Sequence, residues 1–191
     1  MEMVKKADWL SVEDYLAGEL ASEIKHEYLG GNVHAMSGGT VRHQQVAGNV
    51  FLALGGQLKG KPCRPFNSDM KVRLELPNQT RFYYPDVQIV RESSGDEETY
   101  QDKPVVVVEV LSDSTRRIDL GEKREAYLAI PTLKLLLMVD PGKVWIQVDR
   151  RGASGGFGQE LYRSQDEIIE MPEIECRISV SEIYEQVSLS D

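Results

Sequence analysis

The chain has 191 residues, of which 41% are hydrophobic and 28% charged, a composition typical of one globular domain with a sizeable core. Its longest apolar runs, residues 105–108 and 135–139, are far too short to cross a membrane. The 22 Lys and Arg residues against 31 Asp and Glu residues give a net charge of −9, which argues against general adhesion to nucleic acid. Any nucleic-acid function would need a local basic patch, an oligomeric groove or a bound metal ion.

A short helix and a β-hairpin are predicted near the start of the chain. Ser11 is the expected N-cap of a short helix with an acidic first turn that runs to about Leu20. Extended runs at residues 24–29 and 33–36 flank a Gly-rich turn and predict a β-hairpin. With either Gly30-Gly31 or Gly31-Asn32 as the turn, Glu27 and His34 share one face.

A long helix is predicted from Thr40 to about Lys59, because apolar residues recur at every fourth position to form one stripe: Val46, Val50, Leu54 and Leu58. Extended segments follow near residues 69–76 and 82–90, and an acidic loop near residues 93–99. Residues 105–111 are nearly all β-branched or apolar, which indicates a strand buried on both faces.

The last third alternates between helix and strand. Residues 112–115 offer several caps for a helix that ends at Ile130, just before Pro131. Strands at 133–139 and 144–148 are joined by a tight turn and therefore antiparallel. The Gly-rich residues 152–158 are a hairpin loop rather than a phosphate cradle, since no helix follows them. A final strand contains Ile174, Cys176 and Ile178, and a short amphipathic helix follows Ser181.

Neither an internal repeat nor a long linker divides the sequence, so we expect one α/β domain over residues 1–191, a mixed sheet flanked by helices. Cys63 and Cys176 stand alone without a CxxC or disulfide spacing, and the first residues contain no apolar signal core. Both features predict a cytoplasmic protein with reduced thiols.

Glu109 is a carboxylate near the C-terminal end of the strand that should be buried on both faces. Burying it costs several kcal/mol unless a cation or strong hydrogen-bond donors compensate. Asp86 follows Pro85, which restricts the strand there to an edge, a start or a bulge. Mg²⁺ is suited to such a pair of carboxylates, and we predict that the two groups lie about 4–6 Å apart. The alternatives are an ion pair of Glu109 with Arg116, and plain turn chemistry for Pro85-Asp86.

Lys123 belongs to the predicted helix after Glu109, with Asp119 and Tyr127 four residues to either side and therefore on the same face. A lysine directed at a phosphate could orient the attacking water and stabilise transition-state charge. The alternative is an ordinary solvated helix residue. His43 is in register with the apolar stripe of the long helix and so should face the sheet, either as a core histidine or as part of a site.

These residues together resemble a known family. Pro85-Asp86, Glu109 at the end of an all-valine run, the Asp119–Lys123–Tyr127 spacing and Val139-Asp140-Pro141 are similar to the Uma-type endonucleases of the PD-(D/E)XK, restriction-endonuclease-like superfamily. The similarity extends from Glu27 through the terminal helix.

The resemblance implies a mixed core sheet of four to five strands flanked by helices, with Asp86 and Glu109 as the catalytic metal ligands. The superfamily's lysine two residues after the glutamate is replaced by Leu111, and the family pattern implies that Lys123 takes over as the third catalytic residue. Glu27 and His43 match further family positions and, with Tyr127, are expected to support the site. The three histidines lack zinc spacing, and His26 and His34 should lie on opposite hairpin faces, so a histidine metal cluster is not expected.

We therefore predict a Mg²⁺- or Mn²⁺-dependent nuclease whose substrate is nucleic acid, with DNA favoured over RNA. We also predict that the protein forms a homo-oligomer and does not contact a membrane. The rival prediction is a noncatalytic interaction or regulatory domain that keeps the fold and an ion-binding pocket. The positions of four arginines should discriminate between the two, since arginines around the carboxylates would dock a phosphate: Arg42, Arg116, Arg117 and Arg124.

Overall fold

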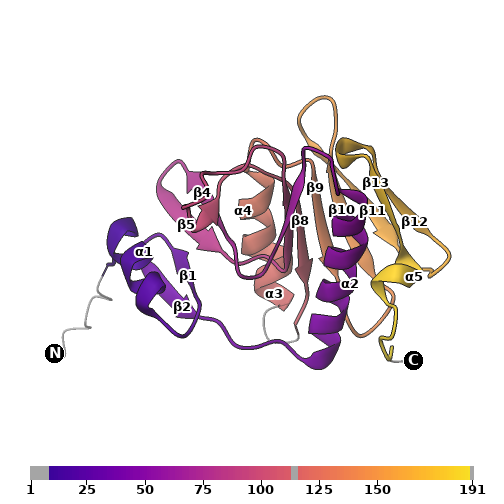
Figure 1. The fold of residues 1–191 in the computed structure, drawn as a ribbon, viewed down its shortest axis with the longest axis horizontal. Helices are drawn as coiled ribbons and strands as arrows, with labels where there is room; N and C mark the ends of the chain where they lie inside the picture. Colours follow the sequence, from indigo (N-terminus) through magenta and orange to yellow (C-terminus); the bar gives the residue numbers. More distant parts are fainter. Residues whose placement is uncertain (1–8, 113–115, 190–191) are drawn as a thin grey trace.

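The structure, a computed structural model, describes residues 9–112 and 116–189. Its centre is a six-stranded sheet of order β11-β10-β9-β8-β6-β3 (Figure 1). Neighbouring strands are antiparallel except for β8 and β9, which are parallel, so the sheet is mixed. Its strands are β3 (Arg64–Asn67), β6 (Val87–Val90), β8 (Pro104–Val110), β9 (Leu135–Val139), β10 (Ile146–Arg151) and β11 (Phe157–Tyr162).

A second sheet has five strands in the order β2-β1-β5-β4-β7, and a two-stranded ribbon lies near the C-terminus. The five strands are β1 (His26–Leu29), β2 (Asn32–Ala35), β4 (Lys71–Leu76), β5 (Gln79–Tyr83) and β7 (Tyr100–Gln101). The ribbon consists of β12 (Ile168–Met171) and β13 (Cys176–Ser179), separated by the short helix η2 (Pro172–Ile174). The strands β3, β7, β11 and β12 were not predicted from the sequence.

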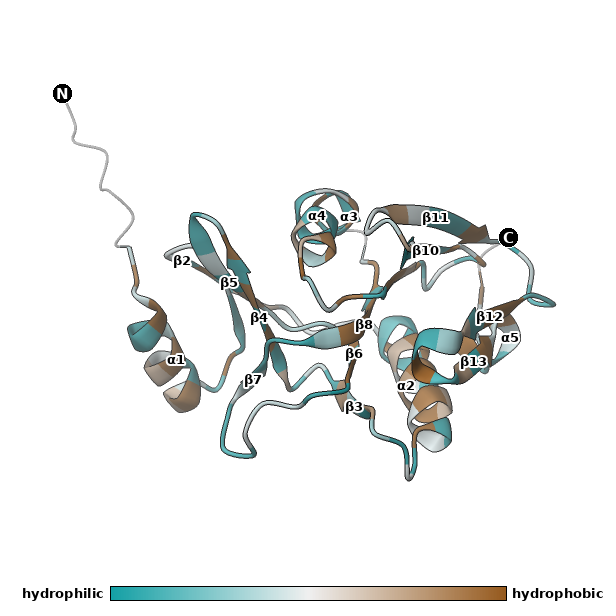
Figure 2. Cartoon of the chain, turned by 90° about the horizontal axis from the view of Figure 1, so that it is seen from above, coloured by the Kyte–Doolittle hydropathy of each residue, from teal (hydrophilic) through white to brown (hydrophobic). Residues whose placement is uncertain are grey.

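Helices cover both faces of the six-stranded sheet (Figure 2). The long helix α2 (Val41–Gln57) and the short α5 (Val180–Ile183) pack on one face. The other face carries a broken helical segment composed of α3 (Arg116–Ile118), η1 (Asp119–Lys123) and α4 (Arg124–Leu128). No helix in the described part of the chain has the length and apolar character needed to span a membrane.

The apolar patterns of the sequence correctly predicted the core. Val46, Val50 and Leu54 of α2 are fully buried against the sheet, and Thr40 caps the helix as expected, since its side chain accepts a hydrogen bond from the backbone of His43. The strand β8 is central, and the fully buried Val106 and Val108 are less exposed than Glu109, which is 5% exposed.

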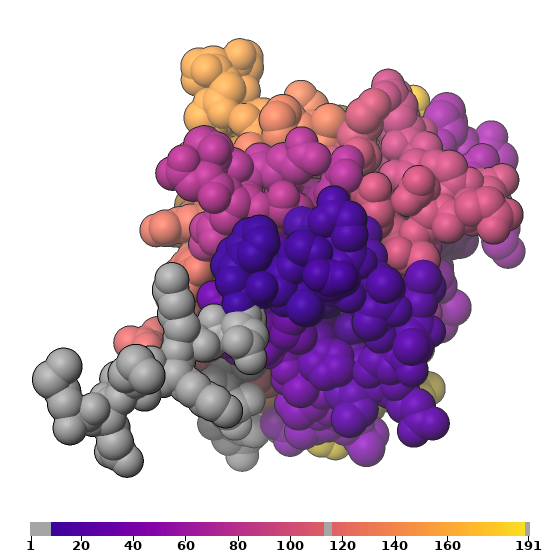
Figure 3. All heavy atoms as spheres, turned by 90° about the vertical axis from the view of Figure 1, so that its left-hand side faces the viewer, coloured from indigo at the N-terminus to yellow at the C-terminus, as the bar shows by residue number. Residues whose placement is uncertain are grey.

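The N-terminal hairpin also matches its prediction. Its turn is Gly30-Gly31, where both glycines have a positive φ (55° and 100°) that side chains rarely adopt, and Glu27 pairs with His34 across the two strands. The helix α1 (Val12–Ala21), capped by Ser11, adds Tyr15 to a small aromatic cluster with Tyr28 and Phe82. In the space-filling view, this N-terminal segment lies directly against residues from the middle of the chain (Figure 3).

The strand predicted at residues 82–90 is wrong as a single element. The chain leaves the five-stranded sheet after Tyr83 and enters the six-stranded sheet at Val87. Pro85 lies in the gap, where its missing N–H group costs no ladder hydrogen bond. Asp86 therefore lies at the junction of the two sheets.

The continuous helix predicted to end at Ile130 is also wrong. A kink at Gly121 (φ −104°, ψ −105°) interrupts it, and its last segment ends at Leu128. The predicted caps at residues 113–115 lie outside the described residues.

Two smaller expectations need correction. The core sheet has six strands instead of four to five. The last helix begins at Val180, ahead of Ser181, because Ser179 and Glu182 form a capping box.

Candidate active site

Asp86 and Glu109 lie close together at one end of the six-stranded sheet. Val87 pairs with Val108 in the antiparallel register of β6 and β8, and Asp86 directly precedes Val87 while Glu109 directly follows Val108. The charge of Asp86 raises the pKa of Glu109, so the two side chains share one environment. The backbone N–H of Val110 donates to Oδ2 of Asp86 at 2.7 Å, which fixes the aspartate against the end of β8. The predicted separation of the two carboxylate groups stays a prediction.

Lys123 is buried, being only 7% exposed, and its ammonium group joins two carboxylates. It lies 2.9 Å from Oε1 of Glu27 and 3.0 Å from Oε1 of Glu109, and 5.2 Å from the ring centre of Tyr83. The alternative of a solvated helix lysine is therefore excluded. Leu111 is buried in an apolar cluster, so β8 supplies no cation at that position.

Tyr127 is the second donor to Glu109. Its hydroxyl donates to Oε1 of Glu109 at 2.6 Å, and it stays protonated because burial and the nearby carboxylates raise its pKa. Oε1 thus contacts both Tyr127 and Lys123, whereas Oε2 accepts no hydrogen bond from the described residues. One oxygen of Glu109 is held in place while the other is available to a ligand.

His43 contacts Asp86 from the first turn of α2, as expected from its register with the apolar stripe. Its Nε2 lies 3.4 Å from Oδ2 of Asp86. Its Nδ1 is buried and has no hydrogen-bond partner within the described part of the chain. Gly39 packs against the ring so closely that a Cβ atom there would lie 2.8 Å from Nδ1. The imidazole is therefore fixed by packing as well as by Asp86.

Burial dominates the electrostatics of this cluster. It raises the pKa of Glu109 to about 8, with the charges of Asp86 and Asp119 adding to the rise, and Lys123 and Tyr127 opposing it. Burial likewise raises the pKa of Asp86 against the influence of His43. For Lys123, burial disfavours the charge, but Glu109 and Glu27 outweigh it and the pKa is raised. The ammonium is therefore permanent, and the acidic groups around it hold their protons to a higher pH than usual.

Asp119 belongs to the cluster, although sequence reasoning gave it no role in the site. Its side chain is 6% exposed and raises the pKa of both Asp86 and Glu109. The signal was its position four residues before Lys123. That spacing survives despite the kink at Gly121, because Asp119, Lys123 and Tyr127 are all buried.

Within residues 9–112 and 116–189, no three His, Cys, Asp or Glu side chains gather as a metal cluster, so a cation here would have at most two such ligands. Mg²⁺ commonly has only one or two carboxylate ligands and keeps several waters. His26 and His34 lie on opposite faces of the hairpin, because His34 pairs with Glu27 and His26 with Ala35.

The four arginines divide into two groups. Arg124 is held by both oxygens of Asp149, at 2.5 and 2.8 Å, and so is directed away from the site. Arg116 pairs with Asp140, which excludes its predicted alternative pairing with Glu109, and Arg117 is exposed on the same short helix. Arg42 directly precedes His43. Arg42, Arg116 and Arg117 thus remain at the same end of the sheet as the carboxylates.

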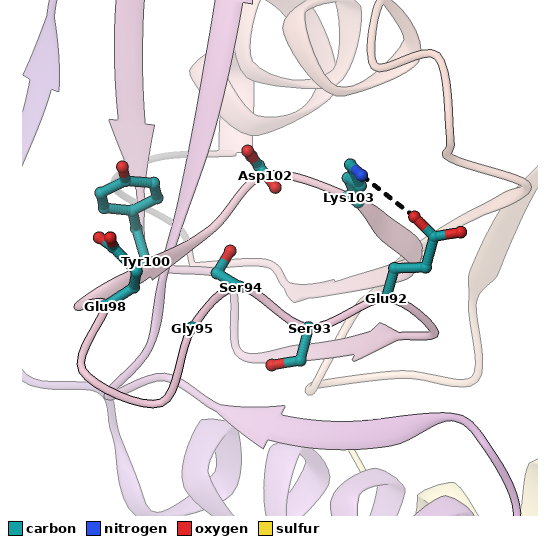
Figure 4. Close-up of a pocket in the computed structure, with 8 residues that line it drawn as sticks. All are labelled: Glu92, Ser93, Ser94, Gly95, Glu98, Tyr100, Asp102 and Lys103. Atoms are coloured by element: carbon teal, nitrogen blue, oxygen red, sulfur yellow. Dashed lines mark hydrogen bonds and ion pairs between the residues drawn. The ribbon is translucent and has the colours of Figure 1, made fainter.

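A surface hollow of about 400 Å³ lies elsewhere, along the loop between β6 and β8 (Figure 4). Three of its eight lining residues are acidic, and its lysine, Lys103, is already paired with Glu92 at 3.0 Å. None of the candidate residues lines it. We therefore place the candidate site at Asp86, Glu109 and Lys123, and assign no role to the hollow.

Comparisons with known proteins bear on the family and the fold of the chain. A model of the family Uma2, described as "Putative restriction endonuclease", matches residues 12–181. The uncharacterized protein slr1290 of Synechocystis sp. is 31% identical over 176 residues, covering 92% of this chain and 91% of that protein. A second Synechocystis protein, the uncharacterized sll1609, is 27% identical over 143 residues, covering 73% and 80%.

One solved structure shares the fold. It is described as a "putative nuclease belonging to DUF820" from Anabaena variabilis, and it superposes with a TM-score of 0.72 over 94% of this chain and 99% of that one. The sequence identity of 14% limits this likeness to the fold.

Replacing Lys123 with methionine should destabilise the protein, because it leaves the buried Glu109 and the partly buried Glu27 without their shared cation. We expect a loss of about 3–5 kcal/mol in the free energy of unfolding at pH 8. The loss should be smaller at pH 5.5, where Glu109 can take up a proton. Urea denaturation at the two pH values measures this, with the exposed Lys59→Met as the control. Equal losses for the two variants would contradict the ion-pair assignment.

The raised pKa of Glu109 should also make stability fall with pH. The folded protein keeps a proton that the unfolded chain releases above its ordinary pKa of 4.5, so this contribution is complete below pH 4.5 and is lost as pH rises through about 8. Glu109→Gln cannot ionise and should lose less stability than the wild type between pH 5 and pH 8. Parallel stability profiles of the two proteins over this range would show that Glu109 titrates normally.

Proposed function

The chain belongs to the Uma2 family, and on that premise we propose that it is a metal-dependent nuclease that hydrolyses phosphodiester bonds in nucleic acid. The observation that carries the proposal is the buried ammonium of Lys123, 3.0 Å from Glu109. It stands beside the carboxylate pair even though Leu111 occupies the strand position where the superfamily has its lysine. The site thus combines two carboxylates with one fixed cation.

The donor set fits a hard divalent cation. Asp86 and Glu109 offer carboxylate oxygens, and the charge of Asp86 disfavours ionisation of Glu109, whose pKa it raises. Glu27 and Asp119 add further negative charge close by, and Lys123 offsets only part of it. Asp86 and Glu109 would hold Mg²⁺ or Mn²⁺, which when bound would lower the pKa of water and screen the phosphate charge.

Other side chains of the site would orient the water molecule, stabilise charge and hold the metal ligands in place. Lys123 presents a permanent ammonium that can orient a water molecule and stabilise the charge that develops on the phosphate. Glu27 holds that ammonium from the neighbouring sheet, and Tyr127 fixes Glu109 through Oε1. His43 steadies Asp86 at Oδ2, the oxygen that also accepts the N–H of Val110. DNA as the substrate and action as a cytoplasmic homo-oligomer stay predictions.

The rival function is a noncatalytic interaction domain with the same fold. Two observations favour it. The net charge is −9, and Arg116 and Arg124 form ion pairs with Asp140 and Asp149, respectively. These ion pairs make the two arginines less available to bind a phosphate. A nuclease and a noncatalytic domain differ in whether Lys123 is needed for anything besides stability.

Metal binding should release protons, because Glu109 carries a proton below pH 8 and must lose it to act as a ligand. We expect about one proton per Mn²⁺ at pH 7, and an affinity that rises roughly tenfold per pH unit below pH 8. Calorimetry in buffers of different ionisation enthalpy measures the release. Asp86→Asn should bind Mn²⁺ at least tenfold more weakly, and equal binding by Asp86→Asn and wild type would refute the ligand role.

Lys123→Ala should retain Mn²⁺ binding and lose cleavage by at least a hundredfold, in line with the removal of one oriented donor. Lys123→Met is a better-packed second variant, and circular dichroism with Mn²⁺ present establishes that each is folded. Cleavage is followed on single- and double-stranded DNA and RNA at low salt with Mg²⁺ or Mn²⁺. Lys59→Met is the matched control and should cleave at the wild-type rate.

Two results would decide against this proposal. Folded Lys123 variants that cleave at the wild-type rate would remove Lys123 from the mechanism. A wild type that cuts none of these substrates with either metal would favour the noncatalytic domain.

A further inference from the structure

Basic side chains from both helical layers meet at the end of the sheet that carries the carboxylates. Arg116 of α3 pairs with Asp140, at the end of β9. Arg42, in the first turn of α2 on the other face, lies at the same turn, because a Cβ atom on Gly142 would be 3.3 Å from its Nη1 and 3.4 Å from Oδ1 of Asp140. We refer to the four residues at this turn and on α3 as the basic rim: Arg42, Arg116, Arg117 and Lys143.

The basic rim borders the candidate active site. Glu109 pairs with Met138 in the parallel register of β8 and β9, and Asp140 is two residues farther along on the same face. Two residues of strand and one strand spacing separate Asp140 from Glu109 by roughly 8 Å. On the other side of the sheet, Arg42 directly precedes His43, which contacts Asp86.

Charge at the basic rim is the reverse of charge in the chain as a whole. The protein has a net charge of −9, yet the rim contributes four cations at this end of the sheet, where Arg116 pairs with Asp140. Arg42, Arg117 and Lys143 are exposed. In the described part of the chain, neither Arg117 nor Lys143 forms an ion pair, so both can accept a phosphate without breaking an internal contact.

We propose that the basic rim binds the phosphate backbone of a nucleic-acid strand next to the bond that is cleaved. This inference rests on the proposed nuclease function. The position follows from the distance of roughly 8 Å between Asp140 and Glu109. A strand fits the position better than an anionic membrane does, because the rim borders buried carboxylates that a flat lipid surface cannot reach.

The test compares two triple variants with the same net charge. Arg42→Gln/Arg117→Gln/Lys143→Gln removes three cations of the basic rim. Lys59→Gln/Lys103→Gln/Lys134→Gln removes three exposed cations from the far ends of α2, β8 and β9. The far end of α2 is about 25 Å from Arg42, given 1.5 Å per helical residue. Both variants change the net charge from −9 to −9 − 3 = −12.

Binding is measured by fluorescence anisotropy on labelled 16-nucleotide single strands and duplexes in EDTA, so that no cleavage occurs. The rim variant should bind at least tenfold more weakly at 50 mM salt. The slope of log affinity against log salt should become shallower by about two to three, the release expected from three lost phosphate contacts. The far-end variant should match the wild type. Thermal melting followed by circular dichroism establishes folding, and Arg117→Gln/Lys143→Gln is the milder variant if the triple variant does not fold.

An unchanged affinity and slope in the rim variant would overturn the proposal, as would an equal loss in the far-end variant, which would indicate overall charge alone. Tighter binding to phosphatidylserine vesicles than to either oligonucleotide would assign the rim to membranes instead. Failure of the nuclease proposal gives a different result, in which the wild type binds oligonucleotides through the rim but cuts none with Mg²⁺ or Mn²⁺.

Discussion

The ammonium of Lys123 is the point at which the separate parts of the structure meet. It comes from the kinked helical segment and contacts Glu27 of the five-stranded sheet and Glu109 of the six-stranded sheet. Such a buried ion triad adds little to stability over a well-packed apolar cluster of the same volume, while removing one member is costly. We interpret its presence as a requirement of the site, because the apolar residues around it could have filled the same space.

Two interruptions of regular secondary structure bring the residues of the site together. Pro85 ends one strand and lets the chain cross from one sheet to the other, which places Asp86 near Glu109 instead of leaving it inside a ladder. Gly121 kinks the helical segment between Asp119 and Lys123, and both of those side chains are buried toward the carboxylates. The site therefore depends on positions where local pairing stops, while the strand β8 and the helix α2 supply the rigid frame.

Sequence patterns predicted the frame and three of the site residues because those signals are local. The valine run of β8 and the apolar residues at every fourth position of α2 each reflect one element packed on its neighbours. Glu109 was identified because it is a charged residue within such an apolar run. The crossing at Pro85 and the kink at Gly121 were missed, since either residue is compatible with the longer element predicted there. Glu27 was named only through the family resemblance, because its contact with Lys123 spans 96 residues and leaves no spacing pattern. Asp119 was identified as facing Lys123, but its effect on the two carboxylates depends on a shared buried environment that a sequence does not display.

The charge distribution gives an acidic protein a way to act on an acidic polymer. At long range, the net charge of −9 opposes the approach of nucleic acid, but salt screens that repulsion beyond about 10 Å. At short range, contact is governed by the side chains at one end of the sheet. There the exposed cations of the basic rim lie beside a buried cluster in which acidic groups outnumber the one ammonium. That cluster cannot hold a phosphate on its own, since its single ammonium is already shared by Glu27 and Glu109. A divalent cation would displace the protons that these acidic groups hold and attract the phosphate at the same time, so the crowding of acidic groups is also what would make the site selective for a metal-bound substrate.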